Sequence, residues 1–136
     1  MKNIEIKVYE KFDFDQIYEL YNSVGWTNYT DNPQMLKGSY ENALKVLGAF
    51  ENEKLVGIIK AVGDNYSILY IQDIIVHPVY QRQGIGTALL KEMVNIYSHV
   101  YQKVLITDNT EKTLNFYKNY GFTDLAEIGC RGFMYL

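Results

Sequence analysis

Apolar and polar residues alternate with a period of two along residues 4–9, which predicts a half-buried β-strand. Three further stretches are almost continuously apolar and have the length of buried strands: residues 47–50, 55–62 and 68–76. Short polar segments at residues 51–54 and 63–65 separate these stretches, as expected for turns. The central part of the chain therefore predicts a meander of consecutive strands.

Two amphipathic helices are predicted between the first strand and this meander. Asp13 is a favourable N-cap for the first helix, whose apolar positions recur at helical spacing: Phe14, Ile17, Tyr18 and Tyr21. The second helix begins with Asn32 as the cap and Pro33 at the first helical position, and it is expected to run to about Ala43. Residues 24–29 lie between the helices and are aromatic without clear periodicity.

The C-terminal half predicts two further helices and three strands. The first of these helices has core-facing residues at helical spacing: Leu89, Leu90, Met93, Val94 and Tyr97. Residues 104–106 are typical of a buried strand, and the last helix is expected to start at residues 108–110. Gly121 would end that helix in the left-handed region of backbone space. Residues 122–128 and 132–136 are expected to form two strands that close the sheet.

The predicted order of elements defines the fold class. A strand is followed by two helices, three strands, a helix, a strand, a helix and two strands. This order predicts an α/β (α+β) fold, with a mixed, mostly antiparallel central sheet and helices on both of its faces. The chain of 136 residues has no evident linker or internal repeat, so residues 1–136 are expected to form a single domain.

Composition excludes several classes of function. A hydrophobic fraction of 48% is typical of a globular protein, and the net charge of −3 argues against a nucleic-acid partner. Cys130 is the only cysteine, so neither a disulfide framework nor a cysteine-based metal site is expected. The sequence has no signal-peptide core and no apolar run of membrane-spanning length. We therefore expect a cytoplasmic protein with no membrane partner and no metal.

The segment after residue 76 is the best candidate for chemistry. An apolar strand leads into a turn with Gly84 and Gly86, and an amphipathic helix follows. Free amides at such a helix start, with no Cβ atoms to block them, suit a phosphate or pyrophosphate group. Thr87-Ala88 stands where a P-loop needs Lys-Ser/Thr, and Leu89 stands where a dinucleotide fingerprint needs glycine.

Two motifs resemble those of the GNAT N-acetyltransferase superfamily. Residues 81–86, Gln-Arg-Gln-Gly-Ile-Gly, fit the pattern Q/R-x-x-G-x-G/A in its strand-turn-helix setting. Downstream, Asn109 is followed by Phe116-Tyr117 and then by Gly121-Phe122, which is similar to a second element of that family. The resemblance implies a GNAT-like fold and acetyl-CoA as co-substrate.

The resemblance also implies roles for individual residues. The backbone of Ile74, Ile75 and Val76 would pair with the pantetheine arm of acetyl-CoA. The backbone amides of one segment would hold the pyrophosphate: Gln81, Arg82, Gln83, Gly84, Ile85, Gly86 and Thr87. The Arg82 side chain is either a phosphate contact or a solvated turn residue. Asn109 would contact the pantetheine, cap its helix, or both. Tyr117 corresponds to the general acid that protonates the departing thiolate.

No general base is assigned by this resemblance. Many relatives carry a glutamate where this chain has Gln72, and glutamine is not a useful base at neutral pH. Regular strand alternation places Asp73 on the opposite face from Gln72, and only a bulge would change that. Tyr70 shares the face of Gln72 and is placed to orient a water. Histidine is a residue type that often serves as a base, but His77 precedes Pro78 at a strand end, which favours a structural role.

The acceptor site is expected to include Trp26, Tyr29, Tyr70 and Gln72, whose aromatic members suit a cationic or aromatic amine. The expected function is transfer of an acetyl group to a primary amine of a small molecule or peptide, by direct attack in a ternary complex. A non-catalytic acyl-CoA sensor of the same fold, a nucleotide- or phosphosugar-binding protein and a transferase of longer acyl groups remain alternatives. A homodimer is possible through exposed strand edges.

Overall fold

The computed structural model describes residues 3–136, which divide into two compact units. The N-terminal unit ends at Val104, and the C-terminal unit comprises Leu105–Leu136. The organisation as one domain stays a prediction. The two units are described separately below.

A five-stranded sheet forms the centre of the N-terminal unit. Its strands lie in sequence order: β1 (Ile4–Val8), β2 (Lys45–Glu51), β3 (Lys54–Gly63), β4 (Ile68–Val76) and β5 (Gln102–Leu105). The first four strands pair antiparallel, as the meander predicted. The amides of Tyr101 and Gln102 donate to the carbonyls of Tyr66 and Ser67, so β5 starts beside the start of β4 and runs parallel to it. The predicted mixed, mostly antiparallel sheet is confirmed.

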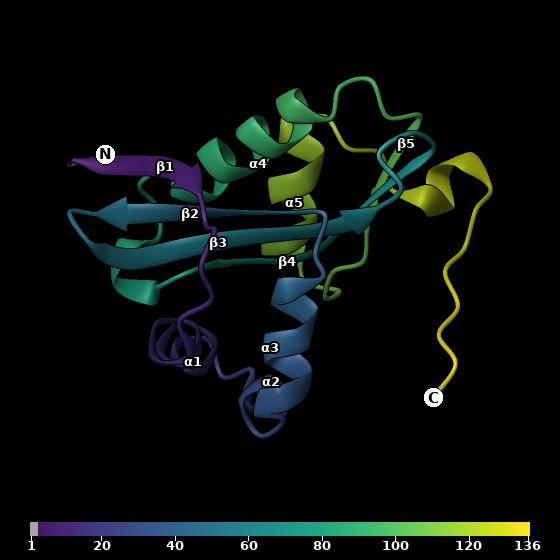
Figure 1. The fold of residues 1–136 in the computed structure, drawn as a ribbon. Helices are drawn as coiled ribbons and strands as arrows, with labels where there is room; N and C mark the ends of the chain where they lie inside the picture. Colours follow the sequence, from purple (N-terminus) through teal and green to yellow (C-terminus); the bar gives the residue numbers. More distant parts are fainter. Residues whose placement is uncertain (1–2) are drawn as a thin grey trace. The chain divides into compact units, whose positions relative to one another are not determined.

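Helices cover both faces of this sheet, as predicted (Figure 1). One face carries α1 (Phe14–Ser23), α2 (Thr27–Thr30) and α3 (Pro33–Glu41), and the other carries α4 (Ile85–Ile96). The four-residue α2 was not predicted, because a single helical turn is too short to show a hydrophobic period. The remaining helices fall where the apolar spacing placed them.

The helix caps agree with the sequence in one case and differ in another. The Asp13 side chain accepts hydrogen bonds from the amides of Asp15 and Gln16, and it therefore caps α1 as predicted. Asn32 occupies the N-cap position of α3, but its side chain makes no capping bond. It donates instead to the carbonyl of Asn28 at 2.9 Å. The short helix α2 supplies this competing acceptor, which the sequence pattern did not reveal.

Apolar side chains pack on both sides of the sheet. Beneath α1 and α3 lies a cluster that includes Ile17, Leu20, Leu36, Ile58 and Ile75. On the other face α4 buries Ile85, Leu89, Leu90 and Met93. Gly57 of β3 lets this helix come close, since a Cβ atom there would lie 3.3 Å from side-chain atoms of both Ile85 and Leu89. The sheet is therefore a two-sided core whose α4 side depends on a small residue.

Enlarging Gly57 is expected to destabilise the protein. Gly57→Val adds methyl groups to a contact that is already tight, and overpacking of this kind costs about 1–3 kcal/mol. Gly38→Ala is the matched control, because Gly38 lies within helix α3 with no atom near its Cβ position. Alanine should stabilise that helix by about 0.5–1 kcal/mol. Urea unfolding of both variants measures the two free energies, and equal values would refute the packing argument.

The C-terminal unit contains helix α5 (Glu111–Tyr120). Thr110 is its N-cap, and its hydroxyl accepts a hydrogen bond from the amide of Thr113. Gly121 ends the helix with φ of 122°, so the predicted positive-φ glycine is confirmed. Its amide donates to the carbonyls of Tyr117 and Lys118. Local hydrogen bonds thus define both ends of α5.

The two strands predicted at residues 122–128 and 132–136 are wrong. A 3₁₀ turn, η2 (Leu125–Ile128), occupies the first segment, and the Asp124 side chain accepts from the amide of Ala126 at its start. Gly129 follows with a left-handed backbone conformation, and the backbone amide of Cys130 donates to the carbonyl of Leu125. These local bonds satisfy backbone groups that a strand would direct to a neighbour. Within residues 129–136 the structure shows no strand, and the terminal apolar side chains are exposed.

Among residues 3–136, every helix is too short or too polar to cross a lipid bilayer.

Candidate active site

The turn between β4 and α4 is held by side-chain hydrogen bonds. It contains a 3₁₀ turn, η1 (Pro78–Tyr80), at whose start the His77 Nδ1 accepts from the amide of Val79 at 3.2 Å. The Gln81 side chain donates to the carbonyl of Val76 at 2.9 Å. The Tyr80 hydroxyl donates to Glu51 Oε1 at 2.6 Å and so ties the turn to the end of β2. His77 has the structural position that its place before Pro78 suggested.

The start of α4 presents free backbone donors. The first intrahelical bond runs from the amide of Ala88 to the carbonyl of Gly84, so the amides of residues 85–87 precede it. Gly84 is the N-cap, has φ of 81° and provides no capping side chain. Within residues 3–136, no heavy atom other than those of Gly84 and its chain neighbours lies within 4 Å of the position that a Cβ would take. Amides at the positive end of a twelve-residue helix form a site for an anion such as pyrophosphate.

The amides predicted to hold the pyrophosphate are not all equally placed. Those of Ile85, Gly86 and Thr87 belong to the first turn of α4, whereas the amide of Gln81 already donates to the carbonyl of Pro78. Arg82 lies between them with φ of 64°, a region that side chains other than glycine seldom adopt. Such a conformation costs about 1–3 kcal/mol and often marks a functional site.

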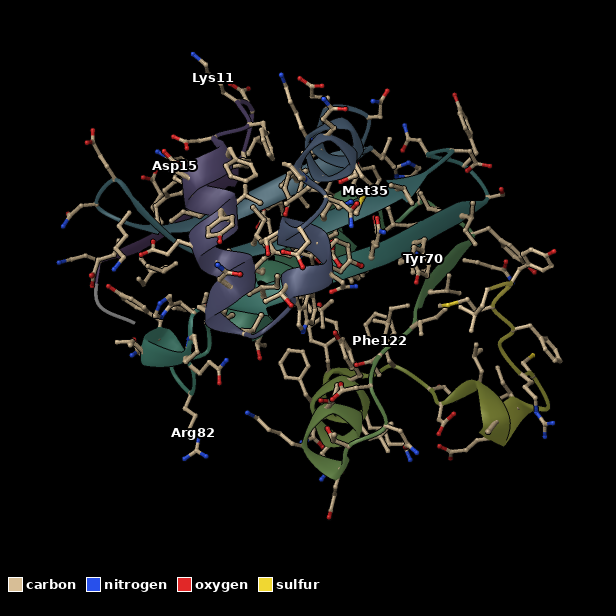
Figure 2. The ribbon with its side chains drawn as sticks, turned by 90° about the horizontal axis from the view of Figure 1, so that it is seen from below. Lys11, Asp15, Met35, Tyr70, Arg82 and Phe122 are labelled. Carbon is tan, nitrogen blue, oxygen red and sulfur yellow. The ribbon has the colours of Figure 1, made fainter. Side chains whose placement is uncertain are left out.

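The Arg82 side chain projects away from the protein at this turn (Figure 2). It is exposed and makes no ion pair with the acidic residues of the described chain, residues 3–136. The guanidinium is therefore available to a bound phosphate.

Replacing Arg82 should weaken binding of a phosphorylated ligand moderately. Arg82→Gln keeps the backbone conformation and removes only the charge, so we expect acetyl-CoA affinity to fall about fivefold, equivalent to about 1 kcal/mol. The loss should shrink at high salt, because exposed charges are screened. Lys91→Gln, an exposed change on the outer face of α4, is the control. Calorimetric titration at two salt concentrations measures the effect, and an affinity equal to that of wild type would make Arg82 a solvated turn residue.

The second half of β4 extends beyond β5. The nine residues of β4 face only four of β5, which starts at the beginning of β4. Because His77 donates to the carbonyl of Val56, ladder alternation directs the peptide groups of Ile75 toward β3. The peptide groups of Ile74 and Val76 point away from β3. The Val76 carbonyl already accepts a hydrogen bond from the Gln81 side chain. A linear ligand has strand backbone available to it on this side.

A bulge interrupts β4 opposite β3. Lys60 pairs with Asp73, but the next residue, Ala61, pairs with Ile71, so Gln72 is the extra residue. Asp73 therefore shares the face of Ile75, toward α1 and α3. The expectation from regular alternation that Asp73 and Gln72 lie on opposite faces is wrong. Both side chains reach Lys60: its Nζ donates to Gln72 Oε1 at 2.8 Å and lies 3.9 Å from Asp73 Oδ2.

Beside the bulge lies a buried polar group that we call the Asp73 network. It consists of Asp73, Lys60, Tyr21 and Tyr40. The Tyr21 hydroxyl donates to Asp73 Oδ2 at 2.8 Å and lies 2.8 Å from the Tyr40 hydroxyl. Lys60 Nζ is 5.3 Å from the centre of the Tyr40 ring. Only 1% of Lys60 and 2% of Asp73 are exposed, so these charges lie inside the protein.

Burial shifts both charged groups toward their neutral forms. It raises the pKa of Asp73, against the opposing effects of a hydrogen bond from Tyr21 and the charge of Lys60. It lowers the pKa of Lys60, and the charge of Asp73 partly counteracts this. Burial also raises the pKa of Tyr21 and of Tyr40. Perturbed groups gathered in this way are frequent at functional sites.

The predicted acceptor residues lie around the same network. Tyr29 of α2 is half-buried, and its ring lies 5.3 Å from that of Tyr21 and 6.1 Å from that of Trp26. Tyr70, also half-buried, faces the same side of the sheet as Asp73, and burial together with the charge of Asp73 raises the pKa of Tyr70. Figure 2 shows Tyr70 to one side of the N-terminal helices. The structure thus brings Trp26, Tyr29, Tyr70 and Gln72 to one side of β4.

Sequence reasoning missed the Asp73 network, although a signal was present. Lys60 and Asp73 are opposite charges within two otherwise apolar stretches joined by a short turn. Pairing these stretches as a hairpin would have suggested that the two charges meet. Tyr21 and Tyr40 look like ordinary core aromatics at helical spacing, so the sequence did not mark them as members of a polar network.

Two predicted residues belong to the C-terminal unit. Tyr117 of α5 has its ring beside those of Phe116 and Phe122, and burial together with the charge of Asp108 raises its pKa to about 12. The hydroxyl therefore keeps its proton at neutral pH. Asn109 is exposed and is not the cap of α5, a position that Thr110 takes. The capping alternative for Asn109 is thereby removed.

Comparison with known proteins places this arrangement in a family. Residues 18–133 match the family described as the acetyltransferase (GNAT) domain. The structure of the GNAT-family acetyltransferase SP0256 from Streptococcus pneumoniae is 38% identical, with a TM-score of 0.89 over 98% of this chain and 97% of that protein. SA2161 from methicillin-resistant Staphylococcus aureus shares the fold at 20% identity, with a TM-score of 0.79 over 98% of each chain.

Curated relatives point in the same direction. The uncharacterized N-acetyltransferase ycf52-like of Prochlorococcus marinus is 27% identical over 118 residues, which are 82% of this chain. The aligned part is 63% of the length of that relative. The family match covers most of the sequence, including both motifs and the turn that opens α4. The chain therefore belongs to the GNAT family of acetyltransferases.

Proposed function

We propose that this protein transfers the acetyl group of acetyl-CoA to a primary amine. The observation that carries the proposal is the start of α4, where Gly84 leaves three successive helix-terminal amides open to an anion. GNAT acetyltransferases generally use acetyl-CoA, whose pyrophosphate suits these donors. When bound, acetyl-CoA supplies an acetyl thioester that an amine can attack.

Each part of the site has a role in holding the two reactants. The amides of Ile85, Gly86 and Thr87 bind the pyrophosphate, and Arg82 adds a positive charge. The outward-facing backbone of Ile74 and Val76 aligns the pantetheine arm along β4. The bulge at Gln72 leaves backbone outside the regular ladder, which makes an amide available to polarise the thioester carbonyl. Holding both reactants in one complex supplies much of the rate.

The acceptor side takes an amine among aromatic residues. Trp26, Tyr29 and Tyr70 offer ring faces that attract a cationic amine before it loses its proton. The neutral amine then attacks the thioester directly, without an acetylated enzyme. We assign Tyr117 the donation of a proton to the departing thiolate, because its raised pKa keeps the hydroxyl protonated.

Binding and turnover test this proposal separately. Calorimetric titration with acetyl-CoA, CoA and ATP should show binding of both CoA species and no response to ATP. A thiol-release assay then follows acetylation of an amino sugar, a diamine, an arylalkylamine and a lysine-containing peptide. Binding without turnover on any amine would favour an acyl-CoA sensor of the same fold. Failure to bind acetyl-CoA would reject the proposal.

A further inference from the structure

The roles proposed above leave the buried pair of Lys60 and Asp73 unexplained. A buried ion pair stabilises a fold no better than well-packed apolar residues would, since the desolvation of two charges offsets their attraction. The two side chains nevertheless lie 3.9 Å apart and are almost fully buried. A third contact suggests a task for them, because the Lys60 ammonium also donates to Gln72 Oε1 at 2.8 Å.

The Lys60 ammonium determines which way the Gln72 amide faces. An ammonium group has donors only, so the amide turns its oxygen, and not its nitrogen, toward Lys60. The Asp73 carboxylate favours this charged form of Lys60, and the Tyr40 ring, 5.3 Å from Nζ, encloses it further. The charge also makes the bond to Gln72 stronger than one between uncharged groups. The amide nitrogen, Nε2, is therefore held on the side away from Lys60.

This amide nitrogen carries two N–H donors that no other residue uses. Throughout residues 3–136, every buried side-chain nitrogen and oxygen has a hydrogen-bond partner. Gln72 is half-buried and its Nε2 has no partner within the same residues, so this nitrogen is open to solvent. A donor with a fixed direction discriminates between ligands, because an apolar ligand removes its water and offers no hydrogen bond in return.

Gln72 lies where the thioester is expected. In the proposed function the pantetheine passes Val76 and then Ile74, so its thioester end reaches the bulge at Gln72 about 7 Å further along β4. The backbone of the bulge is assigned to the thioester carbonyl. The Gln72 side chain extends instead to Lys60, on the face of the sheet that Tyr70 shares. The amide is therefore placed beside the acceptor and not along the CoA.

We infer that Gln72 Nε2 selects acceptor amines that carry a hydrogen-bond-accepting oxygen on the carbon next to the amine-bearing carbon, and that Lys60 is the positioning residue that directs this donor. This inference rests on the proposed function. The oxygen is expected close to the amine, because Gln72 is itself the bulge residue beside the thioester that the amine attacks. Amino ethers, amino alcohols and amino sugars with neighbouring oxygens have this chemistry, whereas a plain alkylamine does not.

An isosteric pair of amines measures this selection. The straight-chain amines phenoxyethylamine and phenylpropylamine differ only in an ether oxygen, which accepts but does not donate, in place of a methylene. The readout is the ratio of their kcat/KM values, ether over methylene. The ether also lowers the basicity of its amine, so the ratio is compared between variants. If neither amine is acetylated, their inhibition constants against the fastest amine of the panel give the same ratio.

Gln72→Glu separates selection from structural support of Lys60. Glutamate still offers an oxygen to Lys60, so a purely structural role would survive, but it has no N–H donor. The ratio should therefore fall about fivefold, as expected for the loss of one hydrogen bond. A change in rate that is common to both amines cancels in the ratio. Gln102→Glu adds the same charge at an exposed position of β5 and should leave the ratio unchanged.

A second variant tests the role of Lys60. Removal of Lys60 alone would leave Asp73 as an uncompensated buried charge. Lys60→Met is therefore combined with Asp73→Asn, which keeps an acceptor for the Tyr21 hydroxyl. Gln72 is then present but free to rotate, so the ratio should lie between that of wild type and that of Gln72→Glu.

Two results would contradict the inference. A Gln72→Glu variant with the wild-type ratio would leave Gln72 as a partner of Lys60 and nothing more. A wild-type ratio in the double variant would show that Lys60 does not direct the donor. Both differ from failure of the proposed function, in which the wild-type protein itself would not bind acetyl-CoA or would acetylate no amine of the panel.

Discussion

Gly84→Glu is expected to abolish acetyl-CoA binding. The new side chain would place a carboxylate at the start of α4, where the free amides of residues 85–87 favour an anion. Repulsion between like charges costs several kcal/mol, so the affinity should fall by more than about 100-fold. Calorimetric titration with acetyl-CoA measures the change. Retained wild-type affinity would show that the pyrophosphate binds elsewhere.

Gly25→Glu separates this effect from backbone strain. Gly25 has φ of 79°, close to the 81° of Gly84, and likewise has no atom within 4 Å of its Cβ position. The two substitutions therefore impose similar strain and add the same charge. We expect both variants to lose free energy of unfolding through this strain, Gly25→Glu the more because its carboxylate follows the C-terminal end of α1, but acetyl-CoA affinity close to that of wild type for Gly25→Glu.

Tyr117→Phe is expected to lower kcat by about 100-fold, since a positioned general acid typically contributes at least that much. The ring stays, so the neighbouring Phe116 and Phe122 keep their contacts. Acetyl-CoA affinity should change little, because only the hydroxyl is lost. Steady-state kinetics with the best amine and calorimetry measure the two quantities. An unchanged kcat would remove Tyr117 from the mechanism.

Tyr120→Phe is the control, because Tyr120 lies on the same helix and is half-buried. The pH dependence adds a check on Tyr117 in the wild-type protein. Its pKa is raised to about 12, so the folded state favours the protonated form. The associated stability is present below the usual tyrosine pKa of about 10 and is lost as the pH rises through about 12. Loss of this acid should therefore not limit kcat below that range.

Much of the N-terminal unit could be predicted because its signals are local. Apolar runs of strand length, separated by short polar turns, gave the meander, and β4 has the predicted bounds Ile68–Val76. Asp13 caps α1 through hydrogen bonds to residues two and three positions later, which a sequence shows directly. The glycine-bearing turn before α4 was likewise visible, because its chemistry depends on consecutive residues.

The bulge could not be predicted, since burial along β4 alternates without a break. Leu69, Ile71, Asp73 and Ile75 are all buried, as in a regular strand. The register nevertheless places Ile71 on the α4 face and Asp73 on the opposite face. A pattern of burial does not record which layer of the protein covers a residue, so the change of face became visible only in the pairing with β3.

The prediction of two strands near the C-terminus was wrong for a different reason. Alternation around Phe133 and Tyr135 resembles a strand, but a strand needs a neighbour, and both side chains are about fully exposed, at 90% and 102%. The sequence pattern describes what a segment is able to form. The cap at Asp124 and the left-handed Gly129 decided the backbone locally instead.

The pairing of Lys60 with Asp73 also constrains how this protein can diverge. Loss of one partner leaves the other charge buried alone, which typically costs about 3–5 kcal/mol and consumes much of the stability of a small domain. A single substitution at either position is therefore expected to destabilise the protein too much to persist. The two residues are therefore expected to be exchanged together for apolar ones, so positions 60 and 73 should covary.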